Sequence, residues 1–132
     1  MNTATTTRAI SWFEIPTHDL DRATRFYETL LDKRLKRENL GGSLLAIFEH
    51  DEGQTGGALV QDPLGSKPAA AGPVLYLEAG ESAQAALERA RRARRAGGII
   101  EGAVIELPRE IGYIAYVLDT EGNRIGLHAR GR

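Results

Sequence analysis

The stretch ISWFEIPTHDL, residues 10–20, places one carboxylate within a run of apolar and aromatic residues. Side chains alternate between the two faces of a β-strand, so Trp12 and Glu14 share one face. Phe13 and Ile15 then lie on the other face and pack in the core. A carboxylate can exchange a proton or orient a polar ligand, and an indole ring offers a flat surface for stacking. We therefore predict that one face of this strand lines a ligand cup and not a sealed core.

The residues around Glu14 open a pattern of a strand, a helix and three further strands. Residues 9–16 predict a strand that ends at Pro16. The next segment, THDLDRATRFYETLLD, has apolar residues at helical spacing, and Asp19 suits its N-cap. Gly-rich turns then separate three short strand candidates, KRLKREN, SLLAIFEH and GGALVQD.

The same order of elements returns after residues 62–72, whose Pro, Gly and Ala content predicts a linker. A strand, a helix with Ser82 at its N-cap and three more strands follow. The sequence thus predicts an α+β fold in which two βαβββ modules, residues 9–61 and 73–130, form a curled, cup-shaped mixed sheet. Residues 9–130 would make one domain, and residues 1–8 a frayed tail.

The composition excludes several classes of protein. The 132 residues contain no cysteine, which excludes disulfide frameworks, thiolate metal sites and cysteine nucleophiles. With 17 Lys and Arg against 18 Asp and Glu, no overall positive field favours nucleic acid or an anionic membrane. The five arginines of residues 89–95 predict a solvated helix face. No apolar run reaches the roughly 20 residues of a membrane span. The first residues lack the pattern of a secretory signal, so we predict a cytoplasmic protein.

The segment EIPTHDLDRATRFYETLL and the closing segment YVLDTEGNRIGLH stand at corresponding ends of the doubled pattern. Together they resemble the first strand and helix, and the last hairpin, of the vicinal oxygen chelate superfamily. That superfamily includes glyoxalase I, bleomycin-resistance proteins and extradiol dioxygenases. The resemblance covers about residues 9–129 and is nearest to small members related to lactoylglutathione lyase. It implies a small-molecule ligand in the cup and a homodimer.

Superfamily members that use a metal usually place its ligands on the first and last strand of each module. Carried over by position, these places hold Trp12, a residue between Ala58 and Val60, Pro73 or Val74, and Gly126. None of these side chains can bind a metal, so we predict a metal-independent protein without a cofactor. The alternative is a glyoxalase-like lyase, isomerase or dioxygenase. It would hold Zn, Ni, Fe or Mn through shifted ligands that include Glu14 and His128.

The resemblance also assigns the site residues, because His128 shares a strand face with Gly126. Glu14 and His128 are the predicted catalytic pair, which would move a proton or orient a ligand. Trp12, Gly126, Tyr113 and Arg109 are the predicted substrate-binding residues. The last two belong to or follow a lid candidate, ELPREIG, at the mouth of the cup.

Other residues receive weaker assignments. Tyr116 has the opposite strand parity to Tyr113 and is expected in the core, and His50 is expected in a loop. Whether the protein is an enzyme stays open, as does whether the cup forms within one chain or across two. A drug-sequestering resistance protein is a further possibility, although aromatic residues make up only 6% of the chain and offer few stacking walls.

Overall fold

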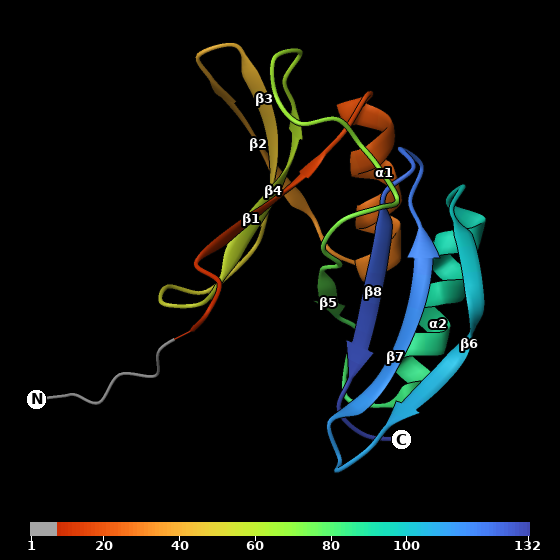
Figure 1. Ribbon diagram of the computed structural model, residues 1–132. Helices are drawn as coiled ribbons and strands as arrows, with labels where there is room; N and C mark the ends of the chain where they lie inside the picture. The colour runs from red at the N-terminus through yellow and green to blue at the C-terminus, as the bar shows by residue number, and fades with distance from the viewer. Residues whose placement is uncertain (1–7) are drawn as a thin grey trace, which may run out of the picture.

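The computed structural model describes residues 8–132, and Figure 1 shows their path. The first half contains β1 (Trp12–Pro16), α1 (Leu20–Leu31), β2 (Leu35–Leu40), β3 (Ser43–Phe48) and β4 (Gly56–Gln61). The second half contains β5 (Tyr76–Glu78), α2 (Ala83–Arg95), β6 (Ile99–Leu107), β7 (Gly112–Leu118) and β8 (Arg124–Ala129). The predicted α+β fold with two βαβββ modules is confirmed. The tail predicted for residues 1–8 lies, except for Arg8, outside the described residues.

The strands form two four-stranded mixed sheets, which we call sheet A and sheet B. Sheet A has the order β1-β4-β3-β2, and sheet B has the corresponding order β5-β8-β7-β6. In each sheet the first strand of the module lies at an edge and pairs in parallel with the last strand. The other neighbours are antiparallel. Within residues 8–132 no strand pair joins the two sheets, and neither sheet closes into a barrel.

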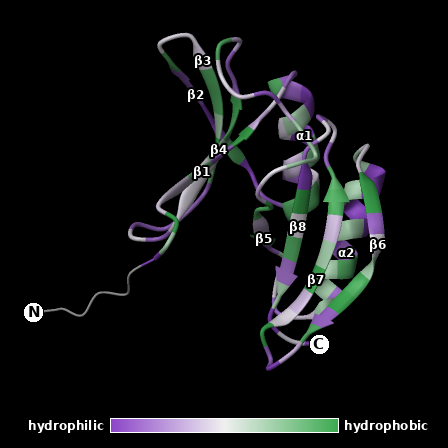
Figure 2. Cartoon of the chain, in the orientation of Figure 1, coloured by the Kyte–Doolittle hydropathy of each residue, from purple (hydrophilic) through white to green (hydrophobic). Residues whose placement is uncertain are grey.

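Each helix begins directly after the residue that the sequence predicts as its N-cap. The Asp19 carboxylate accepts the Arg22 backbone N–H at 3.1 Å, and the Ser82 hydroxyl accepts the Ala85 N–H at 3.2 Å. These bonds satisfy backbone donors that the first helical turn leaves without a partner. Hydrophobic and hydrophilic residues are interleaved along both helices in Figure 2, as expected when only one side is buried. No helix among residues 8–132 is both long and apolar enough to cross a bilayer.

The two helices bring both modules into one hydrophobic core. Helix α1 contacts β3, β4 and α2, whereas α2 contacts β6, β7 and β8. In Figure 1, α1 lies between sheet A and sheet B, and α2 covers the rear of sheet B. The fully buried Phe26 and Tyr27 of α1, Leu59 of β4, and Val117 and Leu127 of sheet B belong to one cluster. The shared core therefore lies on the helix side of each sheet.

The other side of each sheet we call its open face. In Figure 1 the open face of sheet B is turned to the viewer and that of sheet A points away from α1, so the two do not face each other. The open faces of the two modules are therefore apart within one chain, and predicted site residues on different sheets lie apart as well.

Candidate functional site

The open face of sheet A carries the predicted residues Trp12 and Glu14. Trp12 is 42% exposed, whereas Ile15, one position past Glu14, is 2% exposed and lies in the core. The Trp12 indole N–H donates to Glu14 Oε2 at 3.3 Å. Among residues 8–132, Glu14 has no ion pair with an arginine. The strand thus presents an aromatic ring and an unpaired carboxylate to the solvent.

His50 completes this group, although the sequence predicted only a loop residue at this position. Its ring lies over the backbone of Gly56, where an added Cβ would approach Nε2 to 2.6 Å. Its ring centroid is 6.1 Å from that of Trp12, in an edge-on arrangement. His50 Nδ1 is 3.0 Å from the Phe48 carbonyl oxygen, so Nδ1–H donates and Nε2 is left free. The sequence feature that permits this position of the His50 ring is Gly56, which pairs with Trp12 in the sheet and has no side chain to block the ring.

The space beside Glu14 on this single sheet is small. A hollow of about 100 Å³ lies between Glu14, Pro16, Val60 and the turn at residues 62–66. Drug-sized ligands occupy cavities of roughly 300 Å³ or more. Sheet A alone therefore carries side chains that could bind a ligand, but it lacks a cavity large enough to hold one.

The open face of sheet B is built around Gly126. Tyr76 and Tyr116 both pair with Gly126, one from each side, and their hydroxyl groups are 2.6 Å apart. A Cβ at Gly126 would lie 2.4 Å from the Tyr76 ring, so the glycine makes room for that ring. The hydrogen bond with Tyr116 raises the pKa of Tyr76. The predicted substrate-binding Gly126 is thus covered by a tyrosine that the sequence analysis did not single out.

Arg124 extends this tyrosine pair along the face. Its guanidinium carbon is 4.0 Å from the centre of the Tyr116 ring, and its Nε lies 2.9 Å from Glu101 Oε1. Cation–π and ion-pair contacts together hold the arginine flat against the sheet. The open face of sheet B is therefore an ordered aromatic and polar surface.

His128 lies on the same face, and its hydrogen bond holds the predicted lid. Its Nε2–H donates to the Ile111 carbonyl at 2.7 Å. In the adjoining turn, Arg109 and Glu110 adopt left-handed φ angles of 55° and 59°, which non-glycine residues rarely adopt. His128 thus positions the loop, and only its Nδ1 remains available for proton transfer.

The two tyrosines of β7 lie on opposite faces, as predicted, but the face predicted for each is wrong. Tyr113 pairs with the fully buried Ala129, so it lies on the helix side of sheet B and not on the open face. Tyr116, expected in the core, lies on the open face. Pairing with β8 sets this alternation, and the sequence of the preceding loop does not reveal it. Tyr113 and Arg109 both line a different cavity of about 490 Å³, beside Arg130 and away from Gly126.

The structure therefore divides the predicted site between two sheets. Trp12 and Glu14 lie on sheet A, and Gly126 and His128 lie on sheet B. Since the two open faces do not face each other within the chain, it does not bring Glu14 and His128 together as a pair.

Comparisons with known proteins identify a family model that matches the start of the chain and solved structures with a similar fold. The model of a family described as bleomycin resistance protein-like N-terminal matches residues 10–31, which are β1, α1 and the residues just before them. A glyoxalase/bleomycin resistance protein from Albidiferax ferrireducens is similar over 93% of this chain and 99% of its own, with 19% identity and a TM-score of 0.69. A glyoxylase/bleomycin resistance protein/dioxygenase domain from Frankia is similar over 96% and 99%, with 21% identity and a TM-score of 0.67.

The chain has the fold of the glyoxalase/bleomycin resistance proteins. The fold that the resemblance implied is thereby confirmed. Glyoxalase I from Zea mays is also similar, with 19% identity and a TM-score of 0.66, over 91% of this chain and 45% of the maize chain. The search of curated proteins found no match.

The positions that correspond to metal ligands in this superfamily do not fit a metal. These positions hold Trp12, a residue between Ala58 and Val60, Pro73 or Val74, and Gly126. None of them offers the carboxylate or imidazole groups that divalent ions bind. Within residues 8–132, no three His, Asp or Glu side chains lie close enough together to hold an ion.

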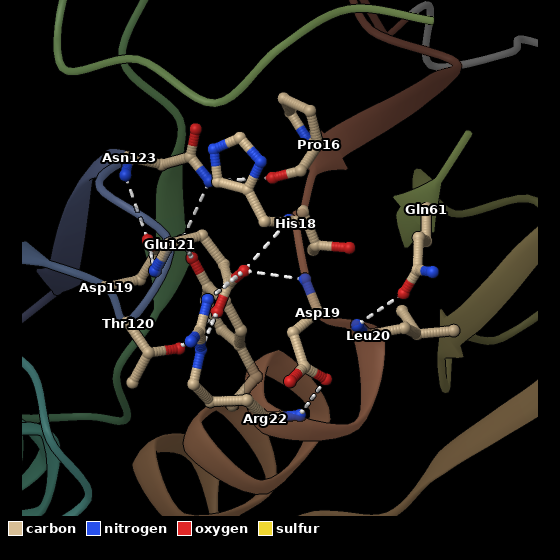
Figure 3. A network of polar contacts seen from close by, with 12 residues as sticks. Pro16, His18, Asp19, Leu20, Arg22, Gln61, Asp119, Thr120, Glu121 and Asn123 are labelled. Atoms are coloured by element: carbon tan, nitrogen blue, oxygen red, sulfur yellow. Dashed lines mark hydrogen bonds and ion pairs between the residues drawn. The ribbon is translucent and has the colours of Figure 1, made fainter. Parts of the chain in front are cut away.

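A polar network around Glu121 fixes the two modules against each other (Figure 3). Its side chain, which is inaccessible to solvent, comes from the turn between β7 and β8. Its carboxylate accepts the backbone N–H groups of His18 and Asp19, both at 2.9 Å. It also accepts Arg22 Nε and Nη2 at 2.7 and 2.9 Å. Helix α1 of the first module is therefore anchored by a carboxylate of the second, and we call this contact the Glu121 clamp.

The electrostatics of the Glu121 clamp favour the ionised acid. Burial alone would raise the pKa of Glu121. The hydrogen bonds from Arg22, the Asp19 N–H, the Thr120 hydroxyl and the His18 N–H outweigh it and lower the pKa to about 2. Next to the clamp, the fully buried Tyr27 hydroxyl donates to Asp119 at 2.6 Å, and burial raises the Tyr27 pKa well above its usual value.

Proposed function

We propose that this protein binds a small organic molecule, without a metal, in a cup assembled from two copies of the chain. Sheet A of one copy would supply one wall, and sheet B of the other copy would supply the opposite wall. The observation that carries this proposal is the position of the two open faces. Both bear aromatic and ionisable side chains, yet within one chain they point in different directions.

The free edges of the sheets support pairing between copies. Strands β1 and β5 are edge strands, and exposed edges tend to be covered by another chain. Near these edges a mainly apolar cavity of about 540 Å³ is lined by residues such as Phe13, Phe48 and Leu75. A two-fold axis beside these edges would cover them and create two equal cups.

The side chains suggest roles within such a cup. Trp12 would stack against a planar part of the ligand, and Glu14 and the free Nε2 of His50 would hydrogen-bond its polar groups. Across the cup, Tyr116 and Arg124 would form the second wall. His128 would position the loop at residues 108–111 and would not act on the ligand directly. A lyase or isomerase activity and a cytoplasmic location stay predictions.

The single tryptophan of the chain makes the proposal testable without knowledge of the natural ligand, since Trp12 is the only one. We expect the protein to sediment as a dimer, and its tryptophan emission to shift to the blue as the concentration rises through the dimerisation range. The planar probe 8-anilinonaphthalene-1-sulfonate should bind the dimer and quench this emission. A protein that stays monomeric at all concentrations would contradict the proposal.

A mixing experiment tests whether each cup contains both chains. Trp12→Ala should damage the sheet A wall, and Tyr116→Ala the sheet B wall, so each variant alone should bind the probe weakly. Random exchange makes half of the dimers mixed, and each mixed dimer has one intact cup. Mixing should thus restore about a quarter of the wild-type sites. No recovery in dimers that have exchanged would refute a shared cup.

Metal analysis provides a separate test of metal independence. Purified protein should contain no stoichiometric Zn, Ni, Fe or Mn, and adding these ions should not change probe binding. A tightly bound ion that is lost in Glu14→Ala would instead favour the lyase or isomerase alternative.

A further inference from the structure

A groove between the ends of the two helices gathers positive charge at a place unrelated to the open faces. It has a volume of about 600 Å³ and lies between α1, the segment that follows α1, and α2. We call it the helix groove. Two carboxylates, Glu28 and Asp32, line it. Five cationic side chains line it as well, namely Arg25, Lys33, Arg34, Arg92 and Arg95.

The cations of the helix groove are weakly engaged by the protein. Arg92 lies 3.9 Å from Asp32, and Arg95 lies 3.8 Å from Glu88, both beyond hydrogen-bond distance. Within the described chain, Arg25, Lys33 and Arg34 have no ion pair. Arg92 Nη1 is buried and has no hydrogen-bond partner among residues 8–132. The exposed side chains of Arg25, Lys33 and Arg34 are therefore free to bind an anion.

Helix dipoles explain only part of this charge. Basic residues stabilise the last turn of a helix, which accounts for Arg92 and Arg95 in α2. Helix α1 has no basic residue in its last turn. Arg25 lies in the middle of α1, and Arg34 lies beyond its end. A solvated helix face would not require cations from two helices and a loop to line the same hollow.

We propose that the helix groove binds a compact anion that carries two or more phosphate groups. Arginine side chains match phosphate oxygens with pairs of parallel N–H donors. The excess of cations over carboxylates favours an anion with several charges, and the volume is typical of a small-ligand site. Nucleic acid fits less well, because no aromatic side chain lines the groove to stack on a base.

Calorimetric titration of the full chain with inorganic tripolyphosphate, at an ionic strength of about 0.15 M, tests this proposal. We expect one saturable site per chain. The double variant Arg34→Gln/Arg95→Gln removes two exposed guanidinium groups, one from the segment after α1 and one from α2. Its affinity should fall by roughly tenfold or more, because each lost charged hydrogen bond weakens binding several-fold.

Arg91→Gln is the matched control. Arg91 lies on the same helix and contacts Glu88 at 3.5 Å, but it does not line the groove. Its variant should bind tripolyphosphate as the wild type does. Absence of saturable binding, or equal weakening in Arg91→Gln, would overturn the proposal in favour of a diffusely solvated surface. Double-stranded DNA that binds more tightly than tripolyphosphate and shows the same variant pattern would overturn it in favour of nucleic acid.

Discussion

Replacing Glu121 by glutamine tests the physical basis of the Glu121 clamp. The substitution keeps the size of the side chain but removes its charge, and it turns an amide group toward donors that need an acceptor. Lowering the pKa from 4.5 to about 2 corresponds to about 3 kcal/mol of stability at neutral pH. The Glu121 side chain is inaccessible to solvent, whereas its partner Arg22 is 45% exposed, so about 3 kcal/mol is an upper value for this contribution. We expect Glu121→Gln to lower the free energy of unfolding at pH 7 by about 2–3 kcal/mol.

The pH dependence separates this charge effect from a loss of packing. A carboxylate with a lowered pKa stabilises the folded state fully above about pH 4.5, and this stabilisation is lost as the pH falls toward 2. The difference between the wild type and Glu121→Gln should therefore shrink below pH 4.5 and nearly vanish near pH 2. This difference in the free energy of unfolding can be measured by urea unfolding at several pH values, monitored by circular dichroism.

Glu88→Gln is a suitable control, because Glu88 is 46% exposed and contacts three arginines only at 3.5 to 4.0 Å. It should cost less than about 1 kcal/mol. The reasoning would be refuted by a Glu121→Gln effect below about 1 kcal/mol at pH 7. It would also be refuted by an effect of equal size at neutral and acidic pH.

Three further predictions follow from close contacts. Gly126→Ala places a Cβ 2.4 Å from the Tyr76 ring and should break the hydrogen bond between the Tyr76 and Tyr116 hydroxyl groups. The pKa of Tyr76 should then fall toward 10 in an alkaline absorbance titration. An unchanged titration midpoint would argue against this contact. His128→Phe removes the donor to the Ile111 carbonyl, so amide hydrogen exchange at residues 108–111 should accelerate while exchange in α1 stays the same. Gly57→Ala directs a Cβ to within 2.4 Å of the Phe13 ring and should destabilise the protein by about 1–3 kcal/mol in urea unfolding, since a packed core resists added volume. Wild-type stability in that variant would show that the ring can move away.

Local patterns were sufficient to predict the elements and the face on which some residues lie. Alternation in residues 12–15 placed Trp12 and Glu14 together because β1 is regular and short. Asp19 and Ser82 marked the helix starts because an N-cap depends on only the next few residues. The same reasoning gave the wrong face for Tyr113. Its phase is set by pairing with Ala129 in a later strand, which the local sequence does not encode.

Contacts between distant segments were beyond the reach of the sequence. The bond from His18 to Glu121 joins residues 103 positions apart, and DTEGN suggests a hairpin turn without revealing that its glutamate anchors α1. His50 lies beside Trp12 only because Gly56 leaves space for its ring. The orientation of the two sheets depends on how α1 and α2 pack together, and the sequence of each helix indicates only that one side is apolar.

The Glu121 clamp also constrains how this protein can change over generations. A doubled βαβββ pattern invites the idea that either half can be exchanged with that of a relative by recombination. Here the start of helix α1 depends on an acid supplied by the other half, so a transplanted first half would arrive without its anchor. Substitutions at Arg22 and at Glu121 should therefore be inherited together.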